Sequence, residues 1–396
     1  MHTHGGMMSD FIIIAIFLYW ITYSVAVIIY LNYLTRKYLL PTERDVIVGD
    51  KSLKTHNQIL EQFEHTDEIN VLILTGGGLR GLIPLHVLSY IEEKTGKKIG
   101  ELFDFASGAS TGAISVSSLM VGDDKGGYRF SATEVRDNYY NHASRMFSSP
   151  WYHQFLTMFG LFAPRFLPDN KIKVLEEFFG DTTLGELKGN ILIPVYNIDE
   201  NNLQIVKNWN PPHGHSNDNY LTKDLINGAS SPPMLFPPVA FRLKGRDHLF
   251  IDPAVILNNP ILQVLLQMQI LFPNKKLNMI LIGNGGTEGI KYDYRSMFGF
   301  GLYGIYQYLF SAPALSSKLY IDFLEQYLRD ASRFNDKISY FRINSIPENS
   351  MSPTNTGDKN LQEIIKFADK MLDENKELID KIIHTITKNR NYNRGN

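Results

Sequence analysis

The sequence predicts an α/β domain, with a mostly parallel or mixed central sheet covered by helices, that follows one membrane-spanning helix. Three observations support this. Residues 11–34 form one uncharged apolar run. Short apolar runs then alternate with amphipathic stretches along most of the chain. Two glycine-rich turns, residues 76–81 and 108–112, each follow a strand-like run and open onto a helix-like run, an order typical of successive strand, turn and helix units.

The composition allows a large buried core and excludes several classes of protein. The chain has 396 residues, of which 44% are hydrophobic and 20% charged, and its formal charge is -2. We therefore expect neither a disordered chain nor nucleic acid as a partner. The chain has no cysteine, which excludes disulfides, zinc–thiolate sites and thiol catalysis. We expect neither a cofactor nor a metal, and the sequence identifies no protein partner.

Residues 11–34 are predicted to form a transmembrane helix behind a short N-terminal tail, residues 1–10. At 1.5 Å per residue this helix reaches roughly 36 Å, enough to cross a hydrocarbon core of about 30 Å with some tilt. A cleaved signal peptide is the alternative. The segment has no basic n-region, its apolar run is too long, and no A-x-A-like site follows it.

Positive charge lies on one side of this run. The basic residues after it are Arg36, Lys37, Arg44, Lys51 and Lys54, whereas residues 1–10 carry only Asp10 as a charged side chain. The positive-inside rule therefore predicts a single-pass membrane protein with its N-terminus outside and the larger part of the chain in the cytoplasm.

The rest of the chain divides into a linker, a main domain and a C-terminal part. Residues 35–70 are interpreted as a juxtamembrane linker with one short helix at 58–64, residues 71–346 as the main domain, and residues 347–396 as a packing helix at 361–388 with a polar tail. In the main domain we predict strands at 71–75, 103–107, 191–198, 203–206, 249–252 and 279–282, and helices at 82–95, 112–120, 172–179 and 260–271.

Two segments, residues 146–166 and 292–328, are unusually aromatic and carry few charges. Each of their side chains, taken alone, fits an ordinary hydrophobic core. As clusters they are also candidates for an acyl-chain channel or for a surface that rests on lipid.

The second glycine-rich turn contains a candidate nucleophile. Ser110 lies between Gly108 and Gly112 in a G-x-S-x-G pattern, after the strand at 103–107 and before a helix of small residues. A nucleophile elbow needs that strand, that helix and small residues on both sides, so that a strained turn can expose the serine hydroxyl.

The first glycine-rich turn has two interpretations. Gly76, Gly78 and Gly81 match the G-x-G-x-x-G fingerprint of dinucleotide-binding domains, but the acidic residue that should end the second strand is missing, because that strand leads into the serine turn. Alternatively, the loop of Gly76, Gly77, Gly78, Arg80 and Gly81 directs backbone N–H groups at an oxyanion.

A serine nucleophile needs a base. After Asp252 the only histidine is His384, on the lysine-rich terminal helix, which makes it a poor candidate. Asp252 follows an apolar strand and precedes small residues. We therefore expect Asp252 to act directly on Ser110 as a dyad, although on its own it also fits a turn or a helix cap.

These residues together resemble the patatin-like phospholipases. The loop Gly76-Gly-Gly-Leu-Arg-Gly81 is similar to the family's G-G-G-x-R-G loop, and Gly108-Ala-Ser-Thr-Gly112 to its G-x-S-x-G. Asp252-Pro-Ala followed by Asn258-Asn-Pro260 resembles its D-G-[GA] motif with a trailing N-N-P, and a proline-rich stretch at residues 229–238 precedes it. The resemblance spans about residues 71–346.

The resemblance implies a three-layer α/β/α domain and a lipid acyl hydrolase. Ser110 would attack an ester of a membrane phospholipid or other glycerolipid, Asp252 would take its proton, and the N–H groups of the glycine loop, aided by Arg80, would stabilise the oxyanion. One position departs from the pattern, because Pro253 replaces the usual glycine after the aspartate. A catalytically weak or inactive membrane-bound module that binds lipid or a partner is therefore the alternative.

Overall fold

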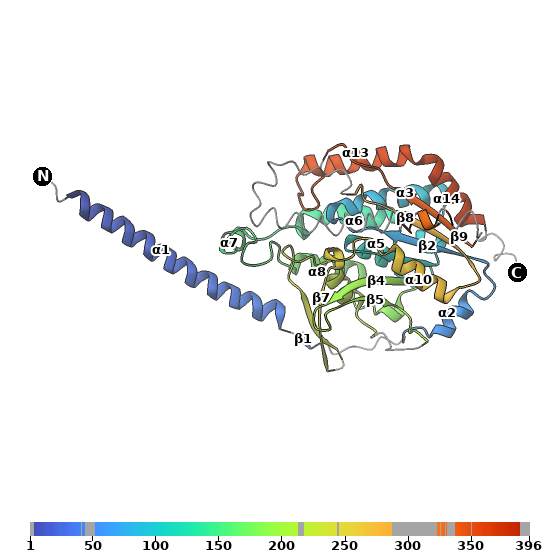
Figure 1. The fold of residues 1–396 in the computed structure, drawn as a ribbon, viewed down its shortest axis with the longest axis horizontal. Coiled ribbons are helices and arrows are strands. Elements are labelled where there is room, and N and C mark those ends of the chain that lie inside the picture. Colours follow the sequence, from blue (N-terminus) through green and yellow to red (C-terminus); the bar gives the residue numbers. More distant parts are fainter. Residues whose placement is uncertain are drawn as a thin grey trace.

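The computed structural model describes residues 4–40, 42–43, 52–212, 218–243, 245–286, 323–324, 326–328, 330, 337–349 and 351–388. They form a long N-terminal helix and an α/β body (Figure 1). The helices are α1 (His4–Leu34), α2 (His56–Gln62), α3 (Leu82–Thr95), α4 (Ile99–Leu102), α5 (Thr111–Leu119), α6 (Ala132–Met146), α7 (Trp151–Leu156), α8 (Asp169–Phe179), α9 (Thr222–Ala229), α10 (Ile261–Leu271), α13 (Asp358–Glu374) and α14 (Lys376–Lys388). Short π or 3₁₀ turns are η1 (Thr35–Leu39), η2 (Gly78–Gly81), η3 (Leu184–Glu186) and η4 (Pro253–Val255).

One mixed sheet forms the centre of the body. Its strands are β1 (Thr42–Glu43), β2 (Glu68–Leu74), β3 (Phe105–Gly108), β4 (Asn190–Asn197), β5 (Asn202–Lys207), β6 (Val239–Leu243), β7 (Arg246–Ile251), β8 (Lys276–Ile282) and β9 (Ile338–Ile343). The order is β1-β6-β7-β4-β3-β2-β8-β9, and β5 also pairs with β4. From β4 to β9 the neighbours are parallel, whereas β4–β5, β4–β7 and β6–β7 are antiparallel.

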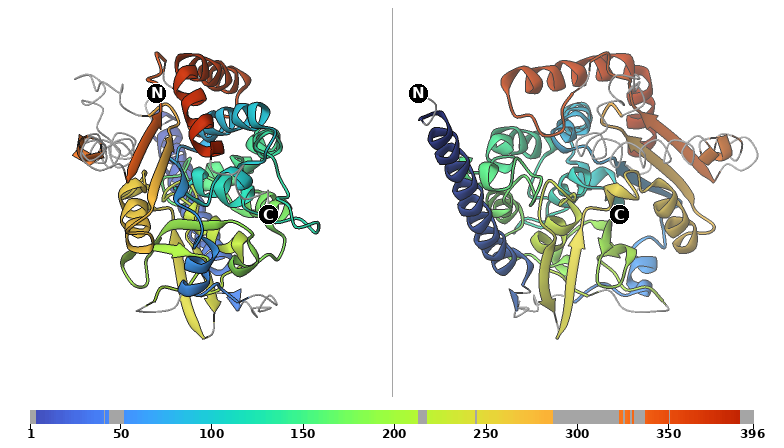
Figure 2. Two further views of the ribbon diagram at one scale, coloured as in Figure 1. Left: turned by 90° about the vertical axis from the view of Figure 1, so that its right-hand side faces the viewer. Right: turned by 60° about the vertical axis from the view of Figure 1, so that its left-hand side comes forward.

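Both faces of the sheet are buried, which explains why β2 reads as a continuous apolar run. Leu72 and Leu74 face a hydrophobic cluster shared with α3, α5, α6, α13 and α14. Val71 and Ile73, on the opposite face, belong to a second cluster with α2 and α10. The body is therefore a three-layer α/β/α domain, as the sequence predicts (Figure 2).

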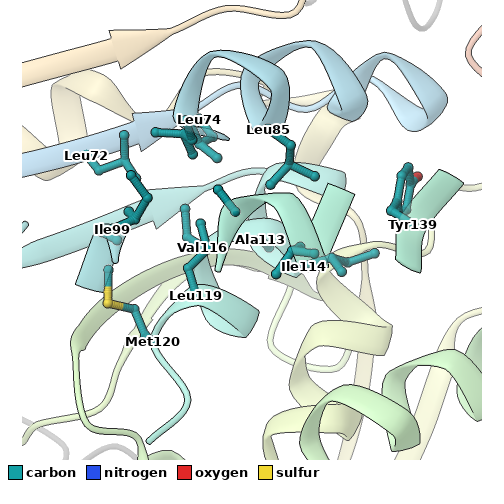
Figure 3. Packing of buried hydrophobic residues seen from close by; sticks show 14 of the residues in the cluster. Leu72, Leu74, Leu85, Ile99, Ala113, Ile114, Val116, Leu119, Met120 and Tyr139 are labelled. Carbon is teal, nitrogen blue, oxygen red and sulfur yellow. The ribbon is translucent and has the colours of Figure 1, made fainter. Parts of the chain in front are cut away.

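Helix α5 lies directly on the sheet because its residues are small. Figure 3 shows Ala113 and Val116 of α5 near Leu72 and Leu74 of β2, all of them buried. Burial of each larger side chain contributes about 1.5–3 kcal/mol. This packing fixes the first turn of α5, and with it the serine turn, against the sheet.

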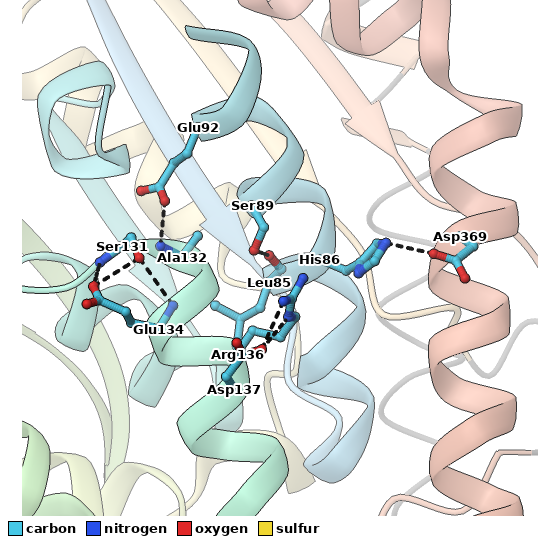
Figure 4. Close-up of polar contacts among 10 residues, drawn as sticks. All are labelled: Leu85, His86, Ser89, Glu92, Ser131, Ala132, Glu134, Arg136, Asp137 and Asp369. Atoms are coloured by element: carbon cyan, nitrogen blue, oxygen red, sulfur yellow. Dashed lines mark hydrogen bonds and ion pairs between the residues drawn. The ribbon is translucent and has the colours of Figure 1, made fainter. Parts of the chain in front are cut away.

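Polar contacts join the outer helices to α3 (Figure 4). The Glu92 carboxylate accepts a hydrogen bond of 2.7 Å from the Ala132 N–H at the start of α6, and His86 pairs with Asp369 of α13 at 2.8 Å. The C-terminal helices are thus part of the body.

Most predicted elements are confirmed, with boundaries shifted by a few residues. Helix α3 has the predicted bounds, 82–95, and is followed by Gly96 in a left-handed conformation. The predicted single helix at 361–388 is two helices, because the chain turns at Asn375, whose N–H bonds back to the end of α13. The elements not predicted from the sequence are α4, α6, α7, α9, β1, β6 and β9. Of the second aromatic segment, residues 292–322 lie outside the described residues.

Candidate active site

Ser110 occupies a tight turn between β3 and α5. Its φ of +53° lies in a region that residues other than glycine rarely adopt, and 8% of the residue is exposed. A Cβ on Gly108 would lie 2.3 Å from the carbonyl carbon of Gly112, and one on Gly112 would lie 2.7 Å from the Leu74 oxygen. At both glycines the added Cβ would collide with backbone atoms, so no side chain fits there. The turn has the geometry of a nucleophile elbow.

The glycine loop lies against this serine. A Cβ on Gly76 would come within 2.8 Å of the Ser110 Cβ, and the Gly77 N–H donates to Thr111 Oγ1 at 3.2 Å. Within the described part of the chain, the N–H groups of Gly78 and Thr111 make no hydrogen bond. Among the described residues, one donor next to Ser110 in the chain and one in the glycine loop therefore have no acceptor.

Amide side chains and a distant carbonyl hold the loop. The Gly76 carbonyl accepts hydrogen bonds from Asn258 Nδ2, at 3.4 Å, and from Asn284 Nδ2. Gly78 has a φ of +58°, and the next N–H, of Leu79, donates to the Pro353 carbonyl at 2.9 Å. The loop is thus fixed by segments that follow β7, β8 and β9.

Arg80 turns back into the loop. Its guanidinium donates to the carbonyls of Gly77, at 3.4 Å, and Gly286, at 3.1 Å. Burial lowers the pKa of Arg80 to about 10, so the side chain stays charged at neutral pH. These contacts favour a role in shaping the loop. Gly81 packs on Thr111, because its Cβ would lie 3.1 Å from the Thr111 Cβ.

Asp252 is fully buried just after β7. Its N–H donates to the Ser231 carbonyl at 3.0 Å, and its Oδ1 accepts from the Ala254 N–H at 2.9 Å. Burial raises the pKa of Asp252 to about 6, while the nearby hydroxyl of Ser110 lowers it. Among the described residues, Oδ2 has no hydrogen bond of ordinary geometry. One carboxylate oxygen is therefore available to the serine.

The position of Asp252 depends on an unusual strand overlap. Strand β7 is antiparallel to β4, so its end would normally lie at the opposite edge of the sheet from the end of β3. The two strands pair only at Tyr196 with Ile251 and Asn197 with Phe250. Because β7 overlaps only the last residues of β4, Asp252 still lies near the edge where β3 ends.

Pro253 fits its position without the loss of a hydrogen bond. It begins η4, and Asp252 caps this turn. An N–H at the first position of a helical turn has no partner within the turn, so proline removes no hydrogen bond there. The departure from the family pattern therefore does not distort the aspartate.

Lys171 of α8 belongs to the site but was not predicted from the sequence. It is almost fully buried, and its Nζ donates to the Asn227 carbonyl at 3.1 Å, the Ser230 carbonyl at 2.9 Å and Ser231 Oγ at 2.6 Å. Burial lowers the pKa of Lys171 to about 7, and the charge of Asp252 opposes this. The ammonium thus stabilises the turn that binds the Asp252 N–H.

The structure brings Ser110, Asp252 and the glycine loop into one site but leaves His384 exposed on α14. No group of three or more His, Asp or Glu side chains that could hold a metal is present among the described residues. The burial of Lys171 could not be predicted from the sequence, because a lysine on an amphipathic helix normally faces water. Asn258 was visible only through the family pattern.

Fold and site together define an α/β protein with a serine in a strained glycine turn beside a buried aspartate. Residues 72–265, which include both, match the sequence model of a family described as Patatin-like phospholipase. This part of the chain belongs to the patatin-like phospholipase family. This membership is consistent with lipid hydrolysis.

Three relatives illustrate the similarity. A protein named cGAMP-activated phospholipase, from Vibrio cholerae, is 29% identical over 74% of this chain and 86% of its own length. Patatin-like protein 2 of Oryza sativa subsp. indica is 25% identical over 80% of this chain and 87% of its own. Patatin-like protein 3 of Arabidopsis thaliana is 29% identical over 49% of this chain and 50% of its own.

Proposed function

We propose that this chain is a membrane-anchored, serine-dependent carboxylic ester hydrolase of the phospholipase A or lysophospholipase type. The observation that carries the proposal is the Ser110 hydroxyl beside the buried carboxylate of Asp252. A carboxylate with a pKa of about 6 is largely ionised at neutral pH and can accept the serine proton.

The reaction has two halves. As Asp252 takes its proton, the Ser110 oxygen bonds to the ester carbonyl carbon, and the carbonyl oxygen becomes an oxyanion. We expect the N–H groups of Gly78 and Thr111, which have no acceptor among the described residues, to bind that oxyanion. Loss of such a donor typically costs about 2.7–4 kcal/mol of barrier lowering. The C–O bond to the alcohol then breaks, and the alcohol leaves with the proton. In the second half, Asp252 takes a proton from water, the water oxygen bonds to the acyl carbon, and the bond from that carbon to the Ser110 oxygen breaks. The fatty acid leaves, and the Ser110 oxygen takes the proton from Asp252.

Helix α1 supports the membrane anchor. Within the described residues one helical segment, Ile14–Tyr38, is long and apolar enough to cross a membrane, a test that a signal sequence also passes. Its first half exposes large apolar side chains, among them Ile14, Phe17 and Leu18. Its second half contacts the body, where Lys37 pairs with Asp169 at 2.8 Å. A signal peptide that is removed would not contact the mature body in this way. We therefore propose a retained single span with the body in the cytoplasm.

Three variants of the full chain test this function on phospholipid vesicles. We expect Ser110→Ala and Asp252→Asn each to lower fatty-acid release by at least about a thousandfold. The control is Asp247→Asn, because Asp247 is an exposed carboxylate on the same strand that pairs with Arg242. The released fatty acids are identified by mass spectrometry, with and without cGAMP, the activator in the name of the Vibrio cholerae relative.

Undiminished release by Ser110→Ala would contradict the assignment. A fluorophosphonate probe separates the two candidate functions, because only an activated Ser110 reacts with it. Failure of the folded wild-type protein to react would favour the non-catalytic lipid- or partner-binding module.

A further inference from the structure

The segment between Arg145 and Arg165 exposes many apolar side chains. Residues 146–164 contain no Asp, Glu, Lys or Arg. Its residues 150–164, here called the aromatic loop, comprise α7 and the turns after it. The exposed large apolar side chains of this loop are Trp151, Tyr152, Phe155, Met158, Phe159, Leu161 and Phe162, with Trp151 79% and Phe159 77% exposed. Such a patch on a folded protein marks an interaction surface.

The backbone of the loop is strained in a way that maintains this exposure. Met158 and Phe159 both have left-handed backbones, with φ of +45° and +56°. Non-glycine residues rarely adopt that region, and the strain persists only where the surrounding structure enforces it. Here the strained pair directs Phe159 into the open. Nearby Met234, also left-handed at +67°, accepts a hydrogen bond from the Arg165 N–H at 2.8 Å.

The loop is attached to α1. The Tyr23 hydroxyl donates to the Phe155 carbonyl at 3.0 Å, and the rings of these residues pack edge to face at 5.5 Å. His153 donates from Nε2 to the Pro164 carbonyl at 2.8 Å, so its Nδ1 accepts from the Tyr30 hydroxyl, also at 2.8 Å. Tyr23 and Tyr30 are two helical turns apart and lie on one face of α1.

These contacts place the loop at a definite depth. The uncharged run of α1 ends at Leu34. At 1.5 Å per residue, Tyr30 lies about 6 Å and Tyr23 about 16 Å before that end. If α1 spans the bilayer, both tyrosines lie in the half nearest the body. The loop that contacts them lies at the same level.

We propose that the aromatic loop inserts into the body-side leaflet beside α1, as a second, non-spanning membrane contact that acyl chains cover. The inference rests on the proposed membrane anchor. Acyl chains are the occupant that the contacts favour, because lipid already surrounds α1 at this level. Tryptophan and tyrosine are typical of this interface, and the exposed Arg165 at the base of the loop can meet a phosphate.

The base of the loop connects this surface to the active site. Phe166 packs on Phe236 with ring centres 5.6 Å apart, and the Lys171 Nζ lies 4.3 Å from the centre of the Phe236 ring. Lys171 in turn supports the turn that binds Asp252. The dyad therefore lies close behind the membrane-facing loop, where a lipid ester need not cross bulk water to reach it.

Site-directed fluorescence on the full chain tests the inference, and the absence of native cysteines makes single labels simple. An NBD fluorophore is attached to Phe159→Cys, with Trp151→Cys as a second loop position. Leu18→Cys reports on the free half of α1. The matched control is Ile270→Cys, because Ile270 is 66% exposed on α10, which lies on the side of the body away from α1 (Figure 1).

The labelled proteins are placed in bilayers of phosphatidylcholine and phosphatidylglycerol, with or without spin-labelled acyl chains as quenchers. For lipid contact we expect emission at the loop and at Leu18→Cys to fall by about half or more, with Ile270→Cys unchanged. Quenching at Leu18→Cys alone would overturn the loop inference and leave the anchor standing. No quenching at any position would overturn both, whereas quenching that includes Ile270→Cys would show nonspecific adsorption and overturn the loop inference. Disulfide-linked dimers of unlabelled Phe159→Cys, together with no quenching of the labelled protein at this position, would show that a second copy covers the loop, which also overturns the loop inference.

Discussion

At the scale of single residues, the site depends on two buried charges of opposite sign. The Asp252 N–H donates to the Ser231 carbonyl and the Asp252 carboxylate accepts from the Ala254 N–H, while Lys171 donates to the side-chain hydroxyl of the same Ser231. Burial disfavours both charged forms, which raises the pKa of Asp252 and lowers that of Lys171. Each charge partly compensates the other.

The pH dependence of activity follows from these shifts. The proposed base must be ionised, so we expect kcat/KM for a soluble ester to rise as the pH rises through about 6. In Lys171→Met the ammonium that lowers the pKa of Asp252 is gone, so the inflection should move to higher pH. Lys173→Met is the control, because Lys173 is exposed on the same helix. Equal pH profiles for all three proteins would contradict this electrostatic coupling.

At the scale of elements, the serine turn exists because α5 approaches the sheet more closely than a side chain allows. Gly112, in the first turn of α5, lies against the carbonyl of Leu74 in β2. The small residues that follow continue this close contact. The position of the helix, more than any side-chain bond, keeps Ser110 in its strained conformation.

Two glycine substitutions separate close packing from backbone strain. In Gly112→Ala the new Cβ would lie 2.7 Å from the Leu74 oxygen. We expect it to lower the free energy of unfolding by about 3 kcal/mol or more and to impair hydrolysis. In Gly96→Ala the Cβ meets nothing within 4 Å, and only the left-handed backbone is strained, so a loss of about 1 kcal/mol is expected. Denaturant unfolding measures both, and equal losses would show that packing at Gly112 is not the cause.

At the scale of the whole molecule, α1 divides into a free half and a half attached to the body. The free half exposes its apolar side chains, whereas Val27 and Leu34 are buried against the rest of the chain. Figure 2 shows the helix along one side of the body. The body is therefore attached to the proposed span by direct contacts as well as by the linker.

We expect charged side chains in the free half of α1 to abolish its insertion into the membrane. A lysine within a span costs up to about 2.5–3.5 kcal/mol, the largest cost being at the centre, so we expect Ile14→Lys with Leu18→Lys to shift the protein from the membrane pellet to the supernatant after an alkaline carbonate wash. Ile270→Lys, an equally apolar and exposed position on α10, should leave the protein in the pellet. Retention of the double variant in the pellet would contradict a spanning α1.

The sequence by itself determined the features that depend on neighbours in the chain. The serine turn, the glycine loop, the end of α3 at Gly96 and the long apolar run are all visible, because turn chemistry and helical periodicity act over a few residues. For the same reason Asp252 could be chosen as the end of a short apolar strand. Strands β6 and β9 were missed, because sheet pairing determines them more than their own pattern does.

Only the tertiary structure decided what lies around these features. It buries Lys171 near Asp252, attaches the glycine loop to Asn258 and Asn284, and lets β7 overlap only the end of β4 so that Asp252 reaches Ser110. It also sets the aromatic loop against α1. These relations join residues far apart in the chain. Their energies come from burial and from pairing across the fold, which no local pattern records.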